Sequence, residues 1–233
     1  TFDGVHIGHQ KIIRDLVSKA KSEDLSAIVL TFSPHPRMVL QKDTQLKMID
    51  TLEEKRQLLE TMGVEILIVQ PFTQEFSRLT AIEFTRDILV NGLNISKLII
   101  GYDHRFGRNR EANVEDLKHF GLDYNFTVDE IPAQDIASIA VSSTKVRNTI
   151  LAGEIEKTNQ YLGRPFSLNG SIVKGDKIGR KIGYPTANLD IKEKHKLRPK
   201  NGVYLVQSQL NNIKYFGMMN IGKRPTVSGK KIQ

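Results

Sequence analysis

The spacing of apolar residues over the first 150 positions alternates between two periods. Residues 9–22 carry apolar side chains three and four positions apart, which predicts an amphipathic helix. Residues 27–32 form a continuous apolar run, which is typical of a strand buried on both faces of a sheet. Similar runs predict further strands at 64–69 and 97–101, and another strand is expected at 124–128.

Helix start and stop signals fall between these strands. Thr51 and Glu54, and again Thr80 and Glu83, have the spacing of a capping box that opens a helix. Glycines at 63 and 92 are expected stops, and further helices are predicted over 113–120 and from Ser142/Ser143 to about residue 152. Repeated strand–helix units predict an α/β fold with a parallel, doubly wound, Rossmann-like sheet. In such a sheet, ligands bind beyond the carboxyl ends of the strands.

The pattern changes near residue 163. Short strands are expected at 166–173, 203–209 and 214–219, separated by turns rich in Gly, Asn and Lys. This pattern predicts a small, all-β antiparallel barrel. We therefore expect two domains, over residues 1–160 and 161–233.

Composition narrows the class of protein. The chain has 233 residues, of which 39% are hydrophobic, as in an ordinary globular protein. It has no cysteine, which excludes disulfides, thiolate metal sites and a cysteine nucleophile and fits the reducing cytoplasm. No apolar run approaches the ~18 residues of a membrane-spanning helix, so no membrane partner is expected.

Charge is divided unevenly between the two parts. The net charge of +8 consists of +12 over residues 163–233, with 15 basic and 3 acidic residues, and −4 over the rest. A basic barrel can bind nucleic acid or phosphorylated small molecules. A nucleic-acid-binding module is therefore one alternative at this stage.

The strongest candidate site lies before the first predicted helix. Gly4 makes a turn there, and Gly8 removes the side chain that would keep the backbone from approaching a phosphate. The start of the helix offers free N–H groups and the positive end of its dipole. His6 and His9 lie on one side of the first turn, where they can donate to phosphate oxygens during group transfer. A pair of capping or core histidines is an equally good interpretation of these residues alone.

Two further candidates follow predicted strands. His35 and Arg37 come after the strand at 27–32, in a loop stiffened by two prolines, although an ordinary exit from a strand explains them as well. Asp103 follows the strand at 97–101 and sits among polar and aromatic residues between two glycines. A carboxylate in that place can bind ribose hydroxyls or orient a metal.

Two basic segments complete the candidates. Ser143 and Thr144, with Arg147 one turn later, would form an anion cradle at a helix start. Residues 175–188 combine glycines with basic residues and end in Pro-Thr-Ala-Asn. Gly and Lys or Arg suit phosphates, and the oxygens of Thr186 and Asn188 suit Mg²⁺. A capped helix with solvated cations, and a basic loop before a strand, are the simpler alternatives.

Taken in order, these motifs resemble those of the bacterial bifunctional riboflavin kinase/FMN adenylyltransferase family, also called FAD synthetases. The resemblance spans nearly the whole chain. It rests on residues 2–10, 31–36, 101–107 and 142–147, and on 179–188, 202–204 and 220–226. The resemblance is specific because the nucleotidyltransferase motifs and the kinase motifs occur together in this order.

The resemblance implies a nucleotidyltransferase domain that joins FMN to the AMP of ATP and releases pyrophosphate. His6 and His9 would stabilise the ATP phosphates, and the same phosphates would be held from the opposite side by Ser143, Thr144 and Arg147. Gly4, Gly8, His35 and Asp103 would lie around the nucleotide.

The resemblance also implies a six-stranded barrel that phosphorylates riboflavin to FMN. Thr186 and Asn188 match its Mg²⁺–nucleotide motif, and the phosphate-binding part would include Gly179, Arg180 and Gly183. Riboflavin, FMN and FAD are then substrates or products, ATP is the co-substrate, and nucleic acid is not a partner. Assembly into a homo-oligomer stays open.

Two departures from the family pattern affect these expectations. Position 104 is His where the family often has an aromatic residue. The kinase's catalytic base is a Glu shortly after the Arg-Pro-Thr stretch, and the sequence stops at Gln233 before any such Glu. We therefore expect this truncated second domain to phosphorylate riboflavin poorly.

A class I aminoacyl-tRNA synthetase shares the His-Ile-Gly-His letters, but this chain lacks a recognisable anticodon-binding part.

Overall fold

A computed structural model describes residues 1–41, 45–101, 105–131, 141–175, 180, 183–211 and 213–222. The chain forms two compact units. The first unit contains residues 1–46 and 52–142, and the second contains residues 47–51 and 143–233. A short piece of the N-terminal half therefore belongs to the second unit.

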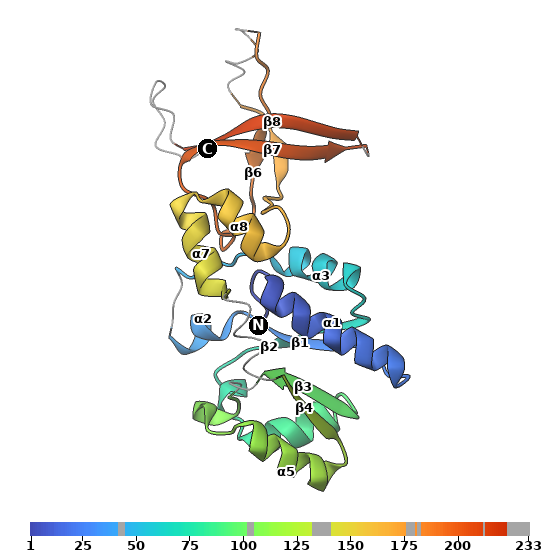
Figure 1. The fold of residues 1–233 in the computed structure, drawn as a ribbon. Helices are drawn as coiled ribbons and strands as arrows, with labels where there is room; N and C mark the ends of the chain where they lie inside the picture. Colours follow the sequence, from blue (N-terminus) through green and yellow to red (C-terminus); the bar gives the residue numbers. More distant parts are fainter. Residues whose placement is uncertain are drawn as a thin grey trace. The chain divides into compact units, whose positions relative to one another are not determined.

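The first half of the first unit is built on a parallel pair of strands. Strands β1 and β2 pair in register from Ile28 opposite Ile66 to Ser33 opposite Pro71. Helices α1 and α3 pack against this pair, as Figure 1 shows, and bury an apolar cluster that includes Ile13, Val17 and Leu59. The elements are α1 (Ile7–Ser22), β1 (Ile28–Ser33), α2 (Pro36–Leu40), α3 (Leu52–Thr61) and β2 (Ile66–Pro71).

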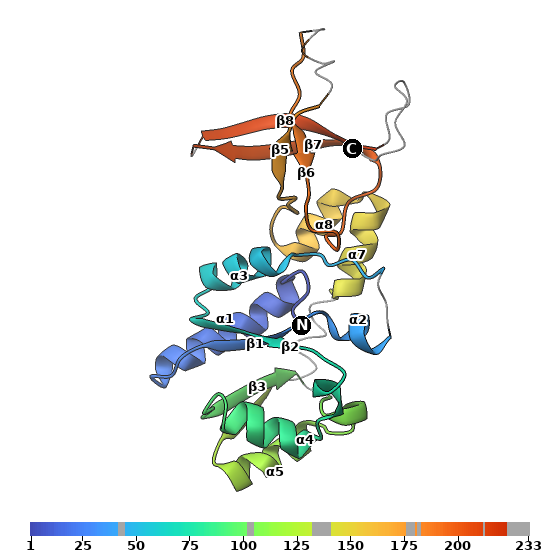
Figure 2. The same ribbon diagram turned by 180° about the vertical axis from the view of Figure 1, so that it is seen from behind.

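The second half of the first unit repeats this plan. Strands β3 and β4 are also parallel, and α4, η2 and α5 lie beside them (Figure 2). The predicted capping box of Thr80 and Glu83 is present, with both reciprocal hydrogen bonds. The helix that it opens continues as a π-helix rather than an α-helix. The elements are η1 (Phe76–Arg78), α4 (Ala81–Glu83), η2 (Phe84–Val90), β3 (Lys97–Gly101), η3 (Arg108–Arg110), α5 (Val114–Tyr124) and β4 (Thr127–Ile131).

In the second unit a pair of helices precedes antiparallel strands. Strand β5 pairs with β6, and β7 forms a long hairpin with β8 (Figure 2). Thr158 Oγ1 on α8 donates to Thr149 Oγ1 on α7 across 2.8 Å, which joins the two helices by a buried hydrogen bond. The elements are α7 (Ser143–Ala152), α8 (Ile155–Leu162), β5 (Ser171–Val173), β6 (Asn188–Asp190), β7 (Gly202–Leu210) and β8 (Ile213–Ile221).

Residues 47–51 are built into the second unit by backbone and side-chain bonds, and we call them the inserted segment. Met48 N donates to His195 O, and Leu197 N donates to Met48 O, so the two stretches form a parallel bridge. The buried Lys196 ammonium donates to Ile49 O at 2.7 Å and lies 4.8 Å from the ring centre of Phe166. Arg164 Nη2 donates to both carboxylate oxygens of the buried Asp50, at 2.8 Å each.

The sequence predictions hold for most elements and fail at particular ones. The parallel α/β arrangement of the first unit is confirmed, although its strands form two separate pairs. The strand predicted at 124–128 was placed too early, because Tyr124 ends α5 and Asn125 caps it in a left-handed conformation. The strand predicted at 166–173 is limited to β5, and helix α8 was missed. The strand pairs β5–β6 and β7–β8 of the second unit are antiparallel as predicted, and the closed barrel stays a prediction.

Candidate functional site

The turn before α1 is strained. Phe2, Gly4 and Val5 have φ values of 50°, 86° and 35°. Glycine adopts such values freely, whereas Phe and above all the β-branched Val do so at a cost. Asp3 and Val5 are nevertheless buried, at 2% and 1% exposure. Strain of this kind persists only where the surrounding structure determines it, and it is concentrated at functional sites.

His6 and His9 form a stacked pair directly after this turn. Their ring centres are 3.7 Å apart and their planes differ by 18°. His6 is the N-cap of α1, and its Nδ1 accepts a hydrogen bond from the backbone N–H of His9 at 3.4 Å. Phe2 packs edge-on against the other side of His9, with ring centres 5.2 Å apart. The prediction that both histidines share the first turn is confirmed.

Both imidazoles are neutral at neutral pH. Burial lowers the pKa of His6 from 6.5 to about 4. The pKa of His9 is held well below 6.5, first by burial, then by the repulsion that a second imidazolium would meet from His6, and by the ammonium of Lys55. Because Nδ1 of His6 accepts a hydrogen bond, its single proton is on Nε2, which can donate to a ligand.

One polar atom in this cluster indicates a ligand. Nδ1 of His9 is buried and, among the described residues, makes no hydrogen bond. Buried polar groups are rarely left without a partner, and the exceptions are typical of binding and catalytic sites. The pair therefore has the properties of a site for an acceptor-rich group such as a triphosphate, and its capping role is compatible with that function.

His35 lies beside the same turn. It is the N-cap of α2, and its Nδ1 accepts from the backbone N–H of Arg37 at 3.2 Å. Its Nε2 is 3.5 Å from Thr1 Oγ1. The structure thus brings His35 close to the start of the His6–His9 motif.

A chain of phenylalanine rings also follows the carboxyl ends of the strands, and sequence reasoning missed it. Neighbouring ring centres are 5.4 to 6.1 Å apart, and the rings meet at steep angles. Most are only partly buried. The signal available in the sequence was a phenylalanine at the end of β1 and another directly after β2. The members of this phenylalanine cluster are Phe32, Phe72, Phe76, Phe84 and Phe106.

In the second unit, the predicted anion cradle opens helix α7. The helix begins at Ser143, as predicted. Arg147 is half-buried, and its Nε donates to the carbonyl oxygen of Lys47 in the inserted segment at 3.3 Å. This contact ties part of its guanidinium to the protein backbone. Ser143 and Thr144 occupy the first turn.

The predicted Mg²⁺ ligands lie at and before β6. Asn188 is the first residue of β6 and pairs with Val173, whereas Thr186 lies ahead of the strand and is exposed. A Cβ on Gly175 would lie 2.2 Å from Nδ2 of Asn188, so a larger residue at 175 would require this amide to move. Gly183 has a φ of 83° and is exposed, as is Arg180. Asp103 and Gly179 lie outside the described residues.

Comparison with known proteins decides the family. Residues 1–145 match the family model described as FAD synthetase, and residues 162–233 match the model described as riboflavin kinase. The chain belongs to the bifunctional riboflavin kinase/FMN adenylyltransferase family. Members with this name include those of Buchnera aphidicola (39% identity, covering 99% of this chain and 74% of the relative) and Listeria monocytogenes (40%, covering 95% and 70%).

A solved structure shares the fold of the whole chain. It is titled a macrolide-efflux protein from Streptococcus pneumoniae, with a TM-score of 0.84 and 32% identity over 100% of this chain and 75% of that one. A shared fold leaves function open, and the family models and curated relatives name flavin chemistry instead. Within the described residues, no helix is long and apolar enough to cross a membrane. Nothing in these comparisons supports the nucleic-acid-binding alternative.

Family membership does not test the individual site residues. His6 and His9 lie in the first unit, and Ser143, Thr144 and Arg147 lie in the second. That both groups hold the same phosphates stays a prediction. The predicted domain boundary near residue 160 also stays a prediction: the compact second unit begins its main part at Ser143, whereas the kinase model begins at residue 162.

Proposed function

We propose that this protein acts in FAD biosynthesis, with one site that phosphorylates riboflavin and one that adenylylates FMN. Its relatives carry the names of both activities. The observation that carries the second activity is the buried pair of neutral histidines at the start of α1, with Nδ1 of His9 lacking a protein partner among the described residues.

In the adenylylation step, a phosphate oxygen of FMN attacks the α-phosphorus of ATP. The bond from that phosphorus to the bridging oxygen breaks, and pyrophosphate leaves with the electron pair. Such a displacement needs positioning and charge stabilisation more than a protein nucleophile. Nε2–H of His6 would donate to a phosphate oxygen whose negative charge grows in this step.

We assign the flavin ring of FMN to the phenylalanine cluster. Phe32 and Phe72 are partly exposed at the carboxyl ends of β1 and β2, where ligands of parallel sheets bind. Aromatic rings favour offset or edge contacts with other aromatic surfaces, and a flat isoalloxazine offers a large one. Phe32 and Phe72 are the members nearest to strand ends.

The donor set of the second unit fits Mg²⁺. A threonine hydroxyl and an asparagine carbonyl are hard oxygen ligands of the kind that Mg²⁺ prefers. Gly175 has no side chain, and the amide of Asn188 occupies the space that a Cβ would take. The side chain of Asn188 therefore lies close to the backbone of Gly175, just after β5. When bound, the metal would neutralise charge on the ATP phosphates. Thr186 and Asn188 would hold it, with Gly179, Arg180 and Gly183 on the phosphates.

The adenylylation is tested by FAD formation from FMN, ATP and Mg²⁺. We expect the protein to make FAD and His9→Ala to lower the rate by about 100- to 1,000-fold, because a preorganised group at the phosphates is lost. His119→Ala is the matched control, since His119 is exposed on α5. FAD formation unchanged in His9→Ala would contradict the assigned role, and no FAD from the unmodified protein would contradict the function.

A further inference from the structure

The strained turn ahead of the histidine pair is held at both ends by side chains from other positions. The carbonyl oxygen of Thr1, at its start, accepts two hydrogen bonds. The carbonyl oxygen of Val5, at its end, accepts one. Phe2 and Val5 have left-handed backbone conformations in this turn. Without these hydrogen bonds, we expect both residues to relax to more favourable φ values.

Lys55 on α3 supplies the first of these bonds. Its Nζ donates to Thr1 O at 2.8 Å, and the residue is only 4% exposed. A buried ammonium is costly unless it is hydrogen-bonded, so the burial of Lys55 on α3 indicates a structural role. Exposed lysines such as Lys21 on α1 carry no such cost.

Thr31 and Gln10 supply the others. The Oγ1 of Thr31, fully buried on β1, donates to the same Thr1 oxygen at 3.2 Å. Nε2 of Gln10 on α1 donates to Val5 O at 2.9 Å. Arg14 Nη2 donates to the Oε1 of Gln10 at 3.2 Å, which fixes the amide so that its nitrogen faces Val5.

We propose that Lys55, Thr31 and Gln10 are positioning residues for adenylyl transfer, because they clamp the strained turn and so fix His6 and His9 for the phosphates. They touch no reacting atom in this assignment. Their effect is on how precisely the two imidazoles are placed, and displacement of such groups by about 1 Å can cost two orders of magnitude in rate. This inference rests on the proposed FMN adenylylation.

The test compares Lys55→Met and Thr31→Val with the control Lys21→Met, in the full chain. Both changes keep the size of the side chain and remove a donor. We expect kcat for FAD formation to fall about tenfold or more while KM for ATP changes less than threefold. Amide hydrogen exchange of the peptide covering residues 1–10 should become about tenfold faster, with exchange in α5 and β4 unchanged. Lys21→Met should change neither quantity.

The two readouts separate the possible failures. Exchange and kcat that match the unmodified protein in both variants would overturn the clamp. Faster exchange with an unchanged kcat would overturn its role in catalysis, as would a general loss of protection across the first unit that explains the lost activity. If the unmodified protein made no FAD, the proposed function would fail, and the exchange data would still decide whether Lys55 and Thr31 hold the turn.

Discussion

The two predicted nucleotide sites differ in how far their residues are buried and held in regular structure. In the first unit His6 is 6% exposed, caps α1 and stacks on His9. In the second unit Gly183 and Thr186 are exposed and lie outside any helix or strand, whereas Asn188 is the first residue of β6. The first arrangement is set before a ligand arrives, which favours catalysis by fixed dipoles. In the second unit, the predicted metal ligand Thr186 lies on an exposed stretch outside regular structure.

Ion pairs in the two units also differ in burial. Breaking a buried pair is expected to have the largest effect on stability. Arg164→Met would leave the carboxylate of Asp50, whose side chain is 1% exposed, without its guanidinium. Removing one partner of a buried pair costs about 3–5 kcal/mol. We therefore expect the free energy of unfolding of the second unit to fall by that amount, measured by urea denaturation.

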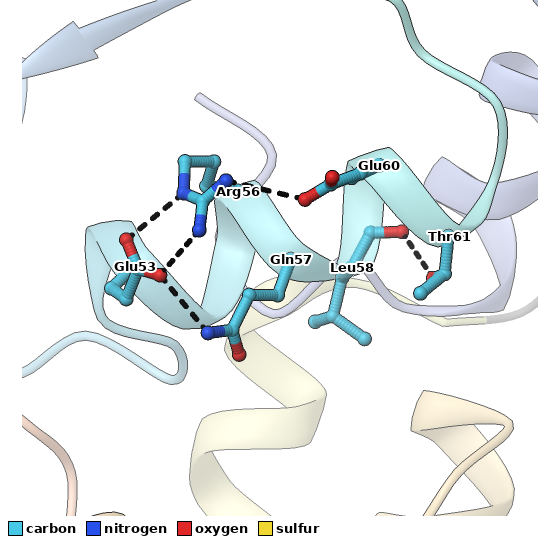
Figure 3. Close-up of polar contacts among 6 residues, drawn as sticks. All are labelled: Glu53, Arg56, Gln57, Leu58, Glu60 and Thr61. Carbon is cyan, nitrogen blue, oxygen red and sulfur yellow. Dashed lines mark hydrogen bonds and ion pairs between the residues drawn. The ribbon is translucent and has the colours of Figure 1, made fainter.

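Arg56→Met is the matched control for this substitution. Arg56 on α3 binds Glu53 and Glu60 at the surface, as Figure 3 shows, and its side chain is 52% exposed. Exposed pairs contribute about 0–1 kcal/mol. An equal loss of stability in the two variants would show that burial does not distinguish the pairs.

Acid should destabilise the first unit through His6. Its pKa is about 4 in the folded chain and 6.5 otherwise, so between these values the unfolded chain binds a proton that the folded chain does not. The free energy of unfolding is then complete above pH 6.5 and falls as the pH drops toward 4, by about 3 kcal/mol from this group. We expect the free energy of unfolding, measured by chemical denaturation, to change less with pH in His6→Asn than in the unmodified protein. Asn is chosen because it keeps a side chain that can cap the helix. An identical slope would contradict the burial of a neutral His6.

A smaller effect, on nucleotide binding at the second site, is expected from a substitution of Gly175. Gly175→Ala would place a methyl group against the amide of Asn188, and we expect about tenfold weaker binding of Mg²⁺·ADP there, as in Asn188→Ala. Gly217→Ala is the control, because a Cβ at Gly217 meets nothing within 4 Å. Titration calorimetry measures the affinities. Tight binding in Gly175→Ala together with weak binding in Asn188→Ala would show that the amide can move aside without loss.

Local patterns in the sequence located most elements of the first unit. The apolar runs became β1, β2 and β3, the box of Thr80 and Glu83 formed as predicted, and the parallel pairing followed from the strand–helix alternation. The predictions failed where neighbouring residues compete. The left-handed conformation of Asn125 places the start of β4 later than predicted. Helix α8 was missed; it begins only three positions after α7 ends.

The residues of the candidate site also differ in whether local sequence patterns could predict them. His6, His9 and His35 were identified from residue type and spacing, and the structure places them around one turn. The contacts of Lys55, Thr31 and the phenylalanine cluster were not predictable, because they join positions distant in the chain through no periodic pattern. The role of Arg147 as a support of the inserted segment was hidden for the same reason.

By itself, the sequence determined the chemistry that this protein offers: histidines at a helix start, a cysteine-free chain, oxygen ligands after a glycine-rich basic stretch, and the order of two modules. Hydrophobic period and residue type are local properties, so they are readable without coordinates. Only the tertiary structure decided that residues 47–51 join the second unit, and that burial keeps both imidazoles neutral. Burial and long-range hydrogen bonds depend on which distant residues meet, and that is a property of the folded chain.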